Sequence, residues 1–224
     1  MEPKNIILKA VCGSRAYGLD NEQSDTDYKG VFVTPTREIL SINSPKDTYD
    51  GKDADGNDFC YYEVQKFIKL ALGCNPTILE ILFLTGYSKL EPMSKMLVDN
   101  RHLFLSNIAR EKYYGYAYSQ MHKLVTRDGS FGNGRNNRYE KHARHCYRLL
   151  YQGKELLETG NLTVTVSPEV REELFAVGKL PPNKLVDKFA EERTKFDAIK
   201  SVLPDKPDYE GVNKLLLKIR KGNW

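Results

Sequence analysis

Short apolar runs separated by polar breaks fill the first part of this chain, and longer stretches with helical spacing follow. Residues 5–12, 25–33 and 58–62 are rich in β-branched and aromatic side chains, so each predicts a strand. Gly13 ends the first run, and residues 14–19 predict a short helix. Apolar positions three and four apart predict helices over residues 63–72, 78–84, 94–105, 107–125, 138–158, 185–203 and 208–221. The pattern favours an α+β fold in which a small mixed sheet with flanking helices precedes a mostly helical region.

Shorter signals predict the connections between these elements. Residues 39–42 predict a short edge element, and the alternation in residues 162–166 predicts a short strand. Thr77 with Glu80 matches a capping box at the start of a helix. Ser167 is followed by proline, which predicts a capped helix that begins at the proline.

The change from mixed to helical pattern predicts two domains, over residues 1–105 and 106–224. Residues 1–64 hold seven basic and twelve acidic side chains, whereas residues 110–154 hold ten basic and three acidic ones. An acidic part beside a basic part suits a metal ion on one side and a polyanion on the other, and ordinary surface charge is the alternative.

Composition narrows the class of protein. The chain has 224 residues, of which 40% are hydrophobic and 29% charged, and it has no apolar run of about 18 residues that could span a membrane. The apolar run at the N-terminus is too short for a signal peptide, so we expect a cytoplasmic protein that does not act in a membrane. The four cysteines have no C-x-x-C spacing, which disfavours zinc and predicts free thiols in a reducing compartment.

The stretch between the first two predicted strands carries the candidate chemistry. Asp25 and Asp27 are two residues apart at the start of a predicted strand, so both side chains are expected on the same face. Paired carboxylates of this kind are hard oxygen ligands suited to Mg²⁺. Gly13 and Ser14 form a turn into a short helix, where backbone N–H groups can bind phosphate. A phosphate site beside a metal site indicates nucleotidyl transfer, in which two metal ions clamp the attacking and leaving oxygens.

A third carboxylate is expected to complete this site. Residues 50–57 predict a hairpin tip rather than a calcium loop, because their order of Asp and Gly does not match that motif. Asp58 follows the tip and begins a predicted strand, so it is the candidate third ligand. Glu63 is the competitor, but it falls where a helix begins and there suits the helix dipole.

Basic side chains follow one face of the helix predicted over residues 138–158. Arg138, Lys141, His145 and Arg148 are three, four and three residues apart, and this stripe either binds phosphate or nucleic acid or is a solvated helix face. The preceding glycine- and arginine-containing loop, residues 129–137, is equally consistent with a lid over a polyanion and with a connector.

The blocks G-S-R-A-Y-G, S-D-T-D-Y-K-G-V, K-F-I-K-L-A-L-G-C-N-P-T-I-L-E-I-L-F and K-H-A-R-H-C-Y-R-L-L carry a family resemblance. Gly-Ser followed by Asp-x-Asp resembles the DNA polymerase β nucleotidyltransferase superfamily. The four blocks together are similar to the predicted nucleotidyltransferases associated with RNA ligases in bacteria and phages. The resemblance covers roughly residues 6–160.

The resemblance implies a polymerase-β-like nucleotidyltransferase domain with Mg²⁺ as cofactor, held as two ions that Mn²⁺ could replace. It implies that Asp25, Asp27 and Asp58 bind the metal and that Gly13 and Ser14 hold the triphosphate of an NTP.

We expect the remaining nucleotide contacts to come from Arg15 and from Lys141, His145 and Arg148.

The expected activity is a nucleotidyltransferase that transfers NMP from an NTP, with ATP favoured, to an RNA or tRNA end. A protein hydroxyl as the acceptor, which would make the chain an AMPylating enzyme, is the first alternative. A non-catalytic RNA-binding or scaffold protein that keeps the fold is the second, and the intact Asp25/Asp27 pair argues against it.

Overall fold

The computed structural model describes residues 2–42, 45–126 and 136–224, with the side chains of residues 125–126 and 136–138 outside the description. The chain forms two compact units, one made of Met1–Ser106 and Lys206–Trp224 and the other of Asn107–Asp205. Each unit has its own architecture and is taken separately below.

A five-stranded mixed sheet organises the first unit. Its strands, in the order β3-β4-β2-β1-β5, are β1 (Ile6–Cys12), β2 (Asp27–Phe32), β3 (Thr48–Lys52), β4 (Asp58–Glu63) and β5 (Lys89–Leu90). The β2–β4 pair is parallel and the other pairs are antiparallel. The mixed sheet is confirmed, although β2 begins two residues later than predicted and β3 and β5 were not predicted as strands.

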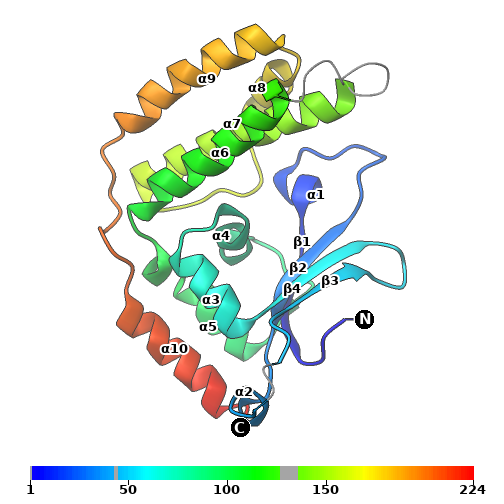
Figure 1. Cartoon of the computed structure of the whole chain (residues 1–224), viewed down its shortest axis with the longest axis vertical. Helices are drawn as coiled ribbons and strands as arrows, with labels where there is room; N and C mark the ends of the chain where they lie inside the picture. The colour runs from blue at the N-terminus through cyan, green and yellow to red at the C-terminus, as the bar shows by residue number, and fades with distance from the viewer. Residues whose placement is uncertain (1, 43–44, 127–135) are drawn as a thin grey trace. The chain divides into compact units, whose positions relative to one another are not determined.

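The remaining elements of the first unit are mostly helical. They are α1 (Gly13–Tyr17), α2 (Thr36–Ile39), α3 (Val64–Leu72), α4 (Pro76–Phe83), α5 (Pro92–Asp99), the 3₁₀ helix η1 (Arg101–Phe104) and α10 (Tyr209–Lys221). Helices α3, α4 and α5 lie on one side of the sheet (Figure 1). The predicted edge element at residues 39–42 is wrong, because α2 occupies the start of that segment.

The predicted capping box at the start of α4 is also wrong. Asn75 is the N-cap, and its side chain accepts a hydrogen bond from the backbone N–H of Ile78. Pro76 takes the first helical position, where its missing N–H is not needed, so the helix begins before Thr77. Glu80 is then inside the helix and only 4% exposed.

The described residues of the second unit form four helices: α6 (Ile108–Thr126), α7 (Asn136–Thr159), α8 (Pro168–Gly178) and α9 (Pro182–Asp197). The strand predicted at residues 162–166 is wrong. Leu162, Val164 and Val166 are buried, as the alternation indicates, but the segment is not part of a β-ladder and bends at Thr165. Its backbone bonds instead to side chains of α7, since Thr163 N donates to Glu155 and Thr163 O accepts from Gln152.

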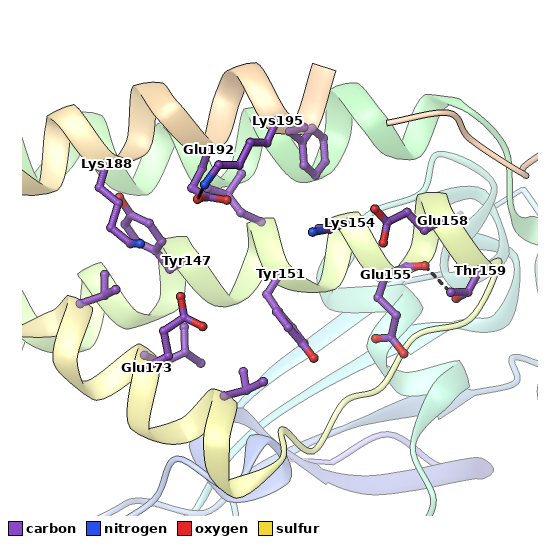
Figure 2. Close-up of a pocket in the computed structure, with 15 residues that line it drawn as sticks. Tyr147, Tyr151, Lys154, Glu155, Glu158, Thr159, Glu173, Lys188, Glu192 and Lys195 are labelled. Atoms are coloured by element: carbon purple, nitrogen blue, oxygen red, sulfur yellow. Dashed lines mark hydrogen bonds and ion pairs between the residues drawn. The ribbon is translucent and has the colours of Figure 1, made fainter. Parts of the chain in front are cut away.

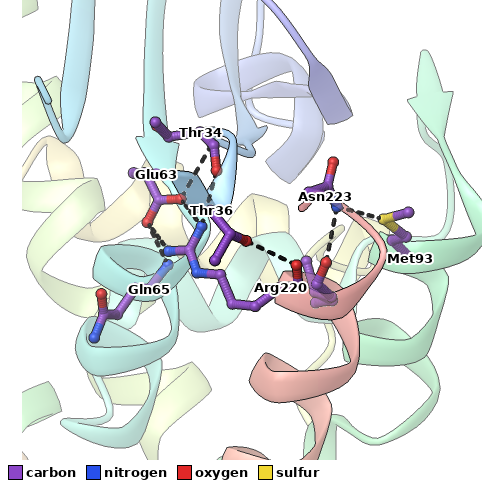
Figure 3. A network of polar contacts seen from close by, with 8 residues as sticks. Thr34, Thr36, Glu63, Gln65, Met93, Arg220 and Asn223 are labelled. Carbon is purple, nitrogen blue, oxygen red and sulfur yellow. Dashed lines mark hydrogen bonds and ion pairs between the residues drawn. The ribbon is translucent and has the colours of Figure 1, made fainter. Parts of the chain in front are cut away.

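The C-terminal helix α10 belongs to the first unit, whereas the sequence grouped it with the preceding helices. Arg220 of α10 forms a buried ion pair with Glu63 at the end of β4, and the two N···O distances are 2.8 and 2.9 Å (Figure 3). Thr36 donates to the Arg220 carbonyl, and Arg220 also donates to Thr34 O. These contacts join segments more than 150 positions apart in the chain, which no local pattern in the sequence indicates.

The cysteines agree with the sequence prediction. All four thiols are free, with Cys12, Cys74 and Cys146 buried and Cys60 partly exposed. Among residues 2–42, 45–126 and 136–224, no helix combines the length and the apolar character needed to cross a membrane.

Candidate active site

A row of side chains crosses one end of the sheet. The strand register pairs Cys12 of β1 with Asp27 of β2, Asp27 with Asp58 of β4, and Asp58 with Lys52 of β3. Paired residues on neighbouring strands share a face, and the strands lie about 4.8 Å apart. The structure therefore places two of the three predicted carboxylates, Asp27 and Asp58, next to each other on the same face of the sheet.

The turn predicted to bind phosphate begins at Gly13, which lies next to Asp27 of this row. The φ of +69° at Gly13 lies in the left-handed region, which glycine tolerates better than any residue with a side chain. A Cβ at this position would lie 2.3 Å from Asp27 Oδ2 and 3.3 Å from Asp27 Cγ. The bare backbone of Gly13 thus allows the Asp27 carboxylate to lie directly against the start of α1.

The helix α1 that follows has only five residues, so it contributes little helix dipole. It ends at Gly18, whose φ of 70° forms a left-handed cap. Tyr17 donates from its hydroxyl to the buried Glu80 at 2.7 Å and so ties α1 to α4. Glu80 therefore has a structural role, because it accepts the hydrogen bond that links the two helices.

Asp25 lies two residues before the start of β2, so strand geometry does not place its side chain beside Asp27. It is also exposed. Arg15 holds this segment in place, since its guanidinium donates to Ser24 O at 2.7 Å and to Asp25 O at 3.3 Å. It also lies 3.9 Å from the Asp20 carboxylate. The side chain that the sequence assigned to the nucleotide therefore positions the loop that carries Asp25.

Lys52 is a site residue that the sequence analysis missed. Its Nζ lies 3.0 Å from Asp58 Oδ1 and donates to Gly56 O in the hairpin tip at 3.2 Å. The hydrogen bond and the charge of Asp58 raise the pKa of the Lys52 ammonium above its usual value, and the charges of Asp25 and Asp27 raise it further. The three predicted metal ligands, Asp25, Asp27 and Asp58, therefore all raise the pKa of the Lys52 ammonium. The sequence held one indication of this contact. A hairpin tip at residues 53–57 places Lys52 opposite Asp58 in the strand register.

The hairpin tip itself is ordered by one aspartate. Asp53 Oδ1 accepts hydrogen bonds from the backbone N–H groups of Asp55 and Asn57, and Asp53 Oδ2 accepts from the Asn57 side chain. Gly56 has a φ of +83° and donates to Asp53 O. The hairpin tip is confirmed over residues 53–57, whereas residues 50–52 of the predicted tip belong to β3. The carboxylate of Asp53 shapes the turn that follows Lys52.

Glu63 does not compete with Asp58 for the role of third carboxylate. It lies at the opposite end of β4, is 3% exposed and is paired with Arg220. Its side chain also accepts from the Gln65 backbone N–H and so caps α3, which agrees with the helix-start interpretation (Figure 3).

The donor chemistry of the carboxylate row fits a hard divalent ion, because Asp27 and Asp58 offer carboxylate oxygens from adjacent strands. Within the described parts of the chain, no three or more His, Cys, Asp or Glu side chains are grouped closely enough to hold a metal ion. Asp58 is paired with Lys52, and Asp25 precedes β2 and is outside the register that pairs Asp27 with Asp58.

The basic residues of α7 differ in exposure. Lys141 is exposed and His145 is partly exposed, but Arg148 is only 1% exposed. Arg148 donates to Gln152 Oε1 and lies 3.0 Å from His145 Nδ1. Because a guanidinium can only donate, Nδ1 accepts and the ring proton of His145 is on Nε2. The nucleotide role predicted for these side chains stays a prediction, and Arg148 already has protein partners.

Ala143, Cys146 and Leu150 of α7 are buried. The predicted lid at residues 129–137 lies almost entirely outside the described residues, as does the side chain of Arg138.

A cavity of about 430 Å³ lies between α7, α8 and α9 in the second unit (Figure 2). Its charged lining combines Lys154, Lys188 and Lys195 with four glutamates, and Lys195 is paired with Glu192 at 2.7 Å. This balance of charge does not favour a polyanion, so the cavity adds no nucleotide or nucleic-acid contact to the carboxylate row.

Comparison with known proteins identifies the family. A model described as the RNA repair pathway DNA polymerase beta family matches residues 1–218. The chain belongs to this family. The RNA repair polymerase-beta family is a family of polymerase-β-like nucleotidyltransferases, and the mixed sheet followed by helices agrees with that fold.

Two proteins with sequences similar to this chain have names that describe them as uncharacterized. One is a 38.9 kDa protein in the nrdC-mobD intergenic region of Enterobacteria phage T4, 31% identical over 128 residues, which are 52% of this chain and 38% of the phage protein. The other is YcgL of Bacillus subtilis (strain 168), 25% identical over 99 residues, 42% of this chain and 38% of YcgL. The matched region thus spans well under half the length of either relative.

Proposed function

We propose that this protein transfers a nucleoside monophosphate from an NTP, preferably ATP, to an RNA or tRNA end. One observation carries the proposal: Asp27 and Asp58 share a register position on adjacent strands, and the Gly13 backbone lies against Asp27. Paired carboxylates beside a turn that begins a helix are consistent with the needs of nucleotidyl transfer. Membership of an RNA repair family supports the reaction class.

In the proposed reaction the acceptor hydroxyl oxygen attacks the α-phosphorus of the NTP. A new P–O bond forms, and the bond from the α-phosphorus to the bridging oxygen of the β-phosphate breaks and releases pyrophosphate. The side chain of Asp58 is 54% exposed, so it can accept the proton from the hydroxyl and pass it to water. A divalent ion held by Asp27 and Asp58 would supply neutralisation of the phosphate charge.

The other site residues have supporting roles in this proposal. Gly13 and Ser14 offer turn N–H groups to the triphosphate, and the loop held by Arg15 keeps the charge of Asp25 near the same end of the sheet. On α7, the exposed Lys141 and the partly exposed His145 are the proposed contacts to the RNA acceptor.

The test is label transfer from each α-³²P-labelled NTP to a panel of RNAs and tRNAs with Mg²⁺ or Mn²⁺. The wild type should label RNA, Asp27→Asn should not, and Asp50→Asn, which removes an exposed carboxylate from β3, should retain the activity. Label only on protein would replace the RNA acceptor by a protein hydroxyl. The absence of any labelled product with every NTP and metal would overturn the enzyme proposal and favour a non-catalytic RNA-binding role.

A further inference from the structure

Lys52 is the cation that faces the carboxylate row from the neighbouring strand. Its register partner is Asp58, whose own parallel partner is Asp27, so the three side chains lie on one face at the same end of the sheet. The Lys52–Asp58 pair is solvent-accessible, with side chains 65% and 54% exposed. An exposed pair of this kind is weak and can be exchanged for another cation.

The hairpin tip determines where this ammonium group lies. Gly56 O accepts from Lys52 Nζ, and the tip is closed by the Asp53 N–Asn57 O hydrogen bond of 2.9 Å. The side-chain bonds of Asp53 to Asn57 rigidify the same turn. Lys52 is therefore held by a structured turn at the edge of the site, with its ammonium group against Asp58.

We propose that Lys52 is a resident cation of the carboxylate row, which a divalent ion must displace from Asp58, so that Lys52 weakens metal binding and makes it reversible. The inference rests on the proposed function, because it takes Asp27 and Asp58 as the ligands of that ion. The ammonium and the ion carry like charges and compete for the same carboxylate oxygen. When the ion is bound, Lys52 is released from Asp58 and becomes a positioning residue at the edge of the site.

The Coulomb repulsion between Lys52 and the divalent ion sets the size of the expected change in metal affinity. Like charges a few ångströms apart in water repel each other weakly, and a divalent ion experiences twice the repulsion of a monovalent one. Replacing Lys52 by methionine keeps most of the side-chain length and removes the charge. The variant should therefore bind Mn²⁺ about five- to thirtyfold more tightly than the wild type at low ionic strength. The difference should shrink in about 1 M KCl, where the Debye length is about 3 Å.

The experiment is Mn²⁺ titration of the full chain without nucleotide, followed by the EPR signal of the free ion. Lys52→Met is compared with Lys89→Met, a matched control that removes an equally strand-borne lysine paired with Glu91 at 2.8 Å on the edge strand β5. Lys89→Met should bind Mn²⁺ as the wild type does. Thermal unfolding in EDTA checks that both variants fold.

The Asp58→Asn variant distinguishes failure of the inference about Lys52 from failure of the proposed metal site. If Asp58→Asn weakens Mn²⁺ binding but Lys52→Met leaves it unchanged or weakens it, the inference about Lys52 is overturned and the proposed site stands. If the wild type binds no Mn²⁺, or Asp58→Asn has no effect, the proposed metal site fails and the inference fails with it. Tighter binding by Lys52→Met, lost in the Lys52→Met/Asp58→Asn double variant, is the result that supports it.

Discussion

The backbone of Gly13 and the carboxylate of Asp27 are in direct contact, since a Cβ on Gly13 would lie 2.3 Å from Asp27 Oδ2. The two residues are 14 positions apart, and the β1–β2 register brings them together through the Cys12–Asp27 pair. The glycine of the phosphate turn and the aspartate of the metal motif therefore form one structural unit.

Replacing Gly13 by alanine should affect both stability and activity. The φ of +69° costs about 1–2 kcal/mol for a residue with a Cβ. The overlap with Asp27 adds about 1–3 kcal/mol or displaces the carboxylate. Gly56→Ala is the matched control, because Gly56 has a φ of +83° but nothing within 4 Å of a Cβ. Urea unfolding should show a larger loss for Gly13→Ala, and equal losses would contradict a close approach to Asp27.

The roles of Asp58 and Glu63 should separate in kinetic and stability measurements. Asp58→Asn removes a charge from an exposed site residue, so it should lower label transfer by about a hundredfold or more with little loss of stability. Glu63→Gln should instead lower the free energy of unfolding, because it leaves Arg220 buried without its carboxylate. A Glu63→Gln variant that folds normally but is inactive would contradict this assignment.

The Glu63–Arg220 pair should be a major anchor of α10. Arg220→Met leaves the buried Glu63 carboxylate without its cation and should destabilise the chain by about 3–5 kcal/mol. The control is Lys214→Met, which breaks the exposed pair with Glu210 on the same helix and should cost about 1 kcal/mol or less. Chemical unfolding measures both. Partial recovery in the Glu63→Gln/Arg220→Met double variant would show that the unpaired charge is the cause.

Cys12 should make stability fall in alkaline solution. Burial raises the pKa of its thiol from 9.0 to about 12, so the protonated thiol favours the folded state. This contribution is complete below pH 9 and is lost as the pH rises from 9 towards 12. The stability lost should amount to roughly 1 kcal/mol at pH 10.

Urea unfolding at several pH values tests this dependence on Cys12. The Cys12→Ala variant should lose less stability between pH 8 and 10 than the wild type. Cys60→Ala, at a partly exposed thiol, should lose as much as the wild type. Parallel pH profiles for all three proteins would exclude a contribution from the Cys12 thiol.

Local pattern was sufficient for most of the secondary structure. The apolar runs around β1, β2 and β4 and the helical spacing of α3, α6 and α7 depend on side chains near in sequence, and the structure confirms these elements within two residues at each end. The helix predicted over residues 185–203 is also present as α9, but it begins at Pro182 and ends at Asp197. The errors occur where a neighbouring group overrides the pattern. With Asn75 as the N-cap, α4 begins at Pro76, before the predicted cap at Thr77. The backbone of Thr163 forms its hydrogen bonds with side chains of α7 instead of with another strand.

The sequence by itself determined the fold class, the Gly-Ser turn and the Asp-x-Asp spacing, because these follow from composition and from side-chain periods within single segments. Only the tertiary structure decided that Asp58 rather than Glu63 lies beside Asp27, since that depends on the parallel register of β2 with β4. It also showed that Arg15 holds the Asp25 loop and that Lys52 faces the carboxylates. These are contacts between segments, and their geometry is set by strand register and turn closure, which one segment alone does not specify.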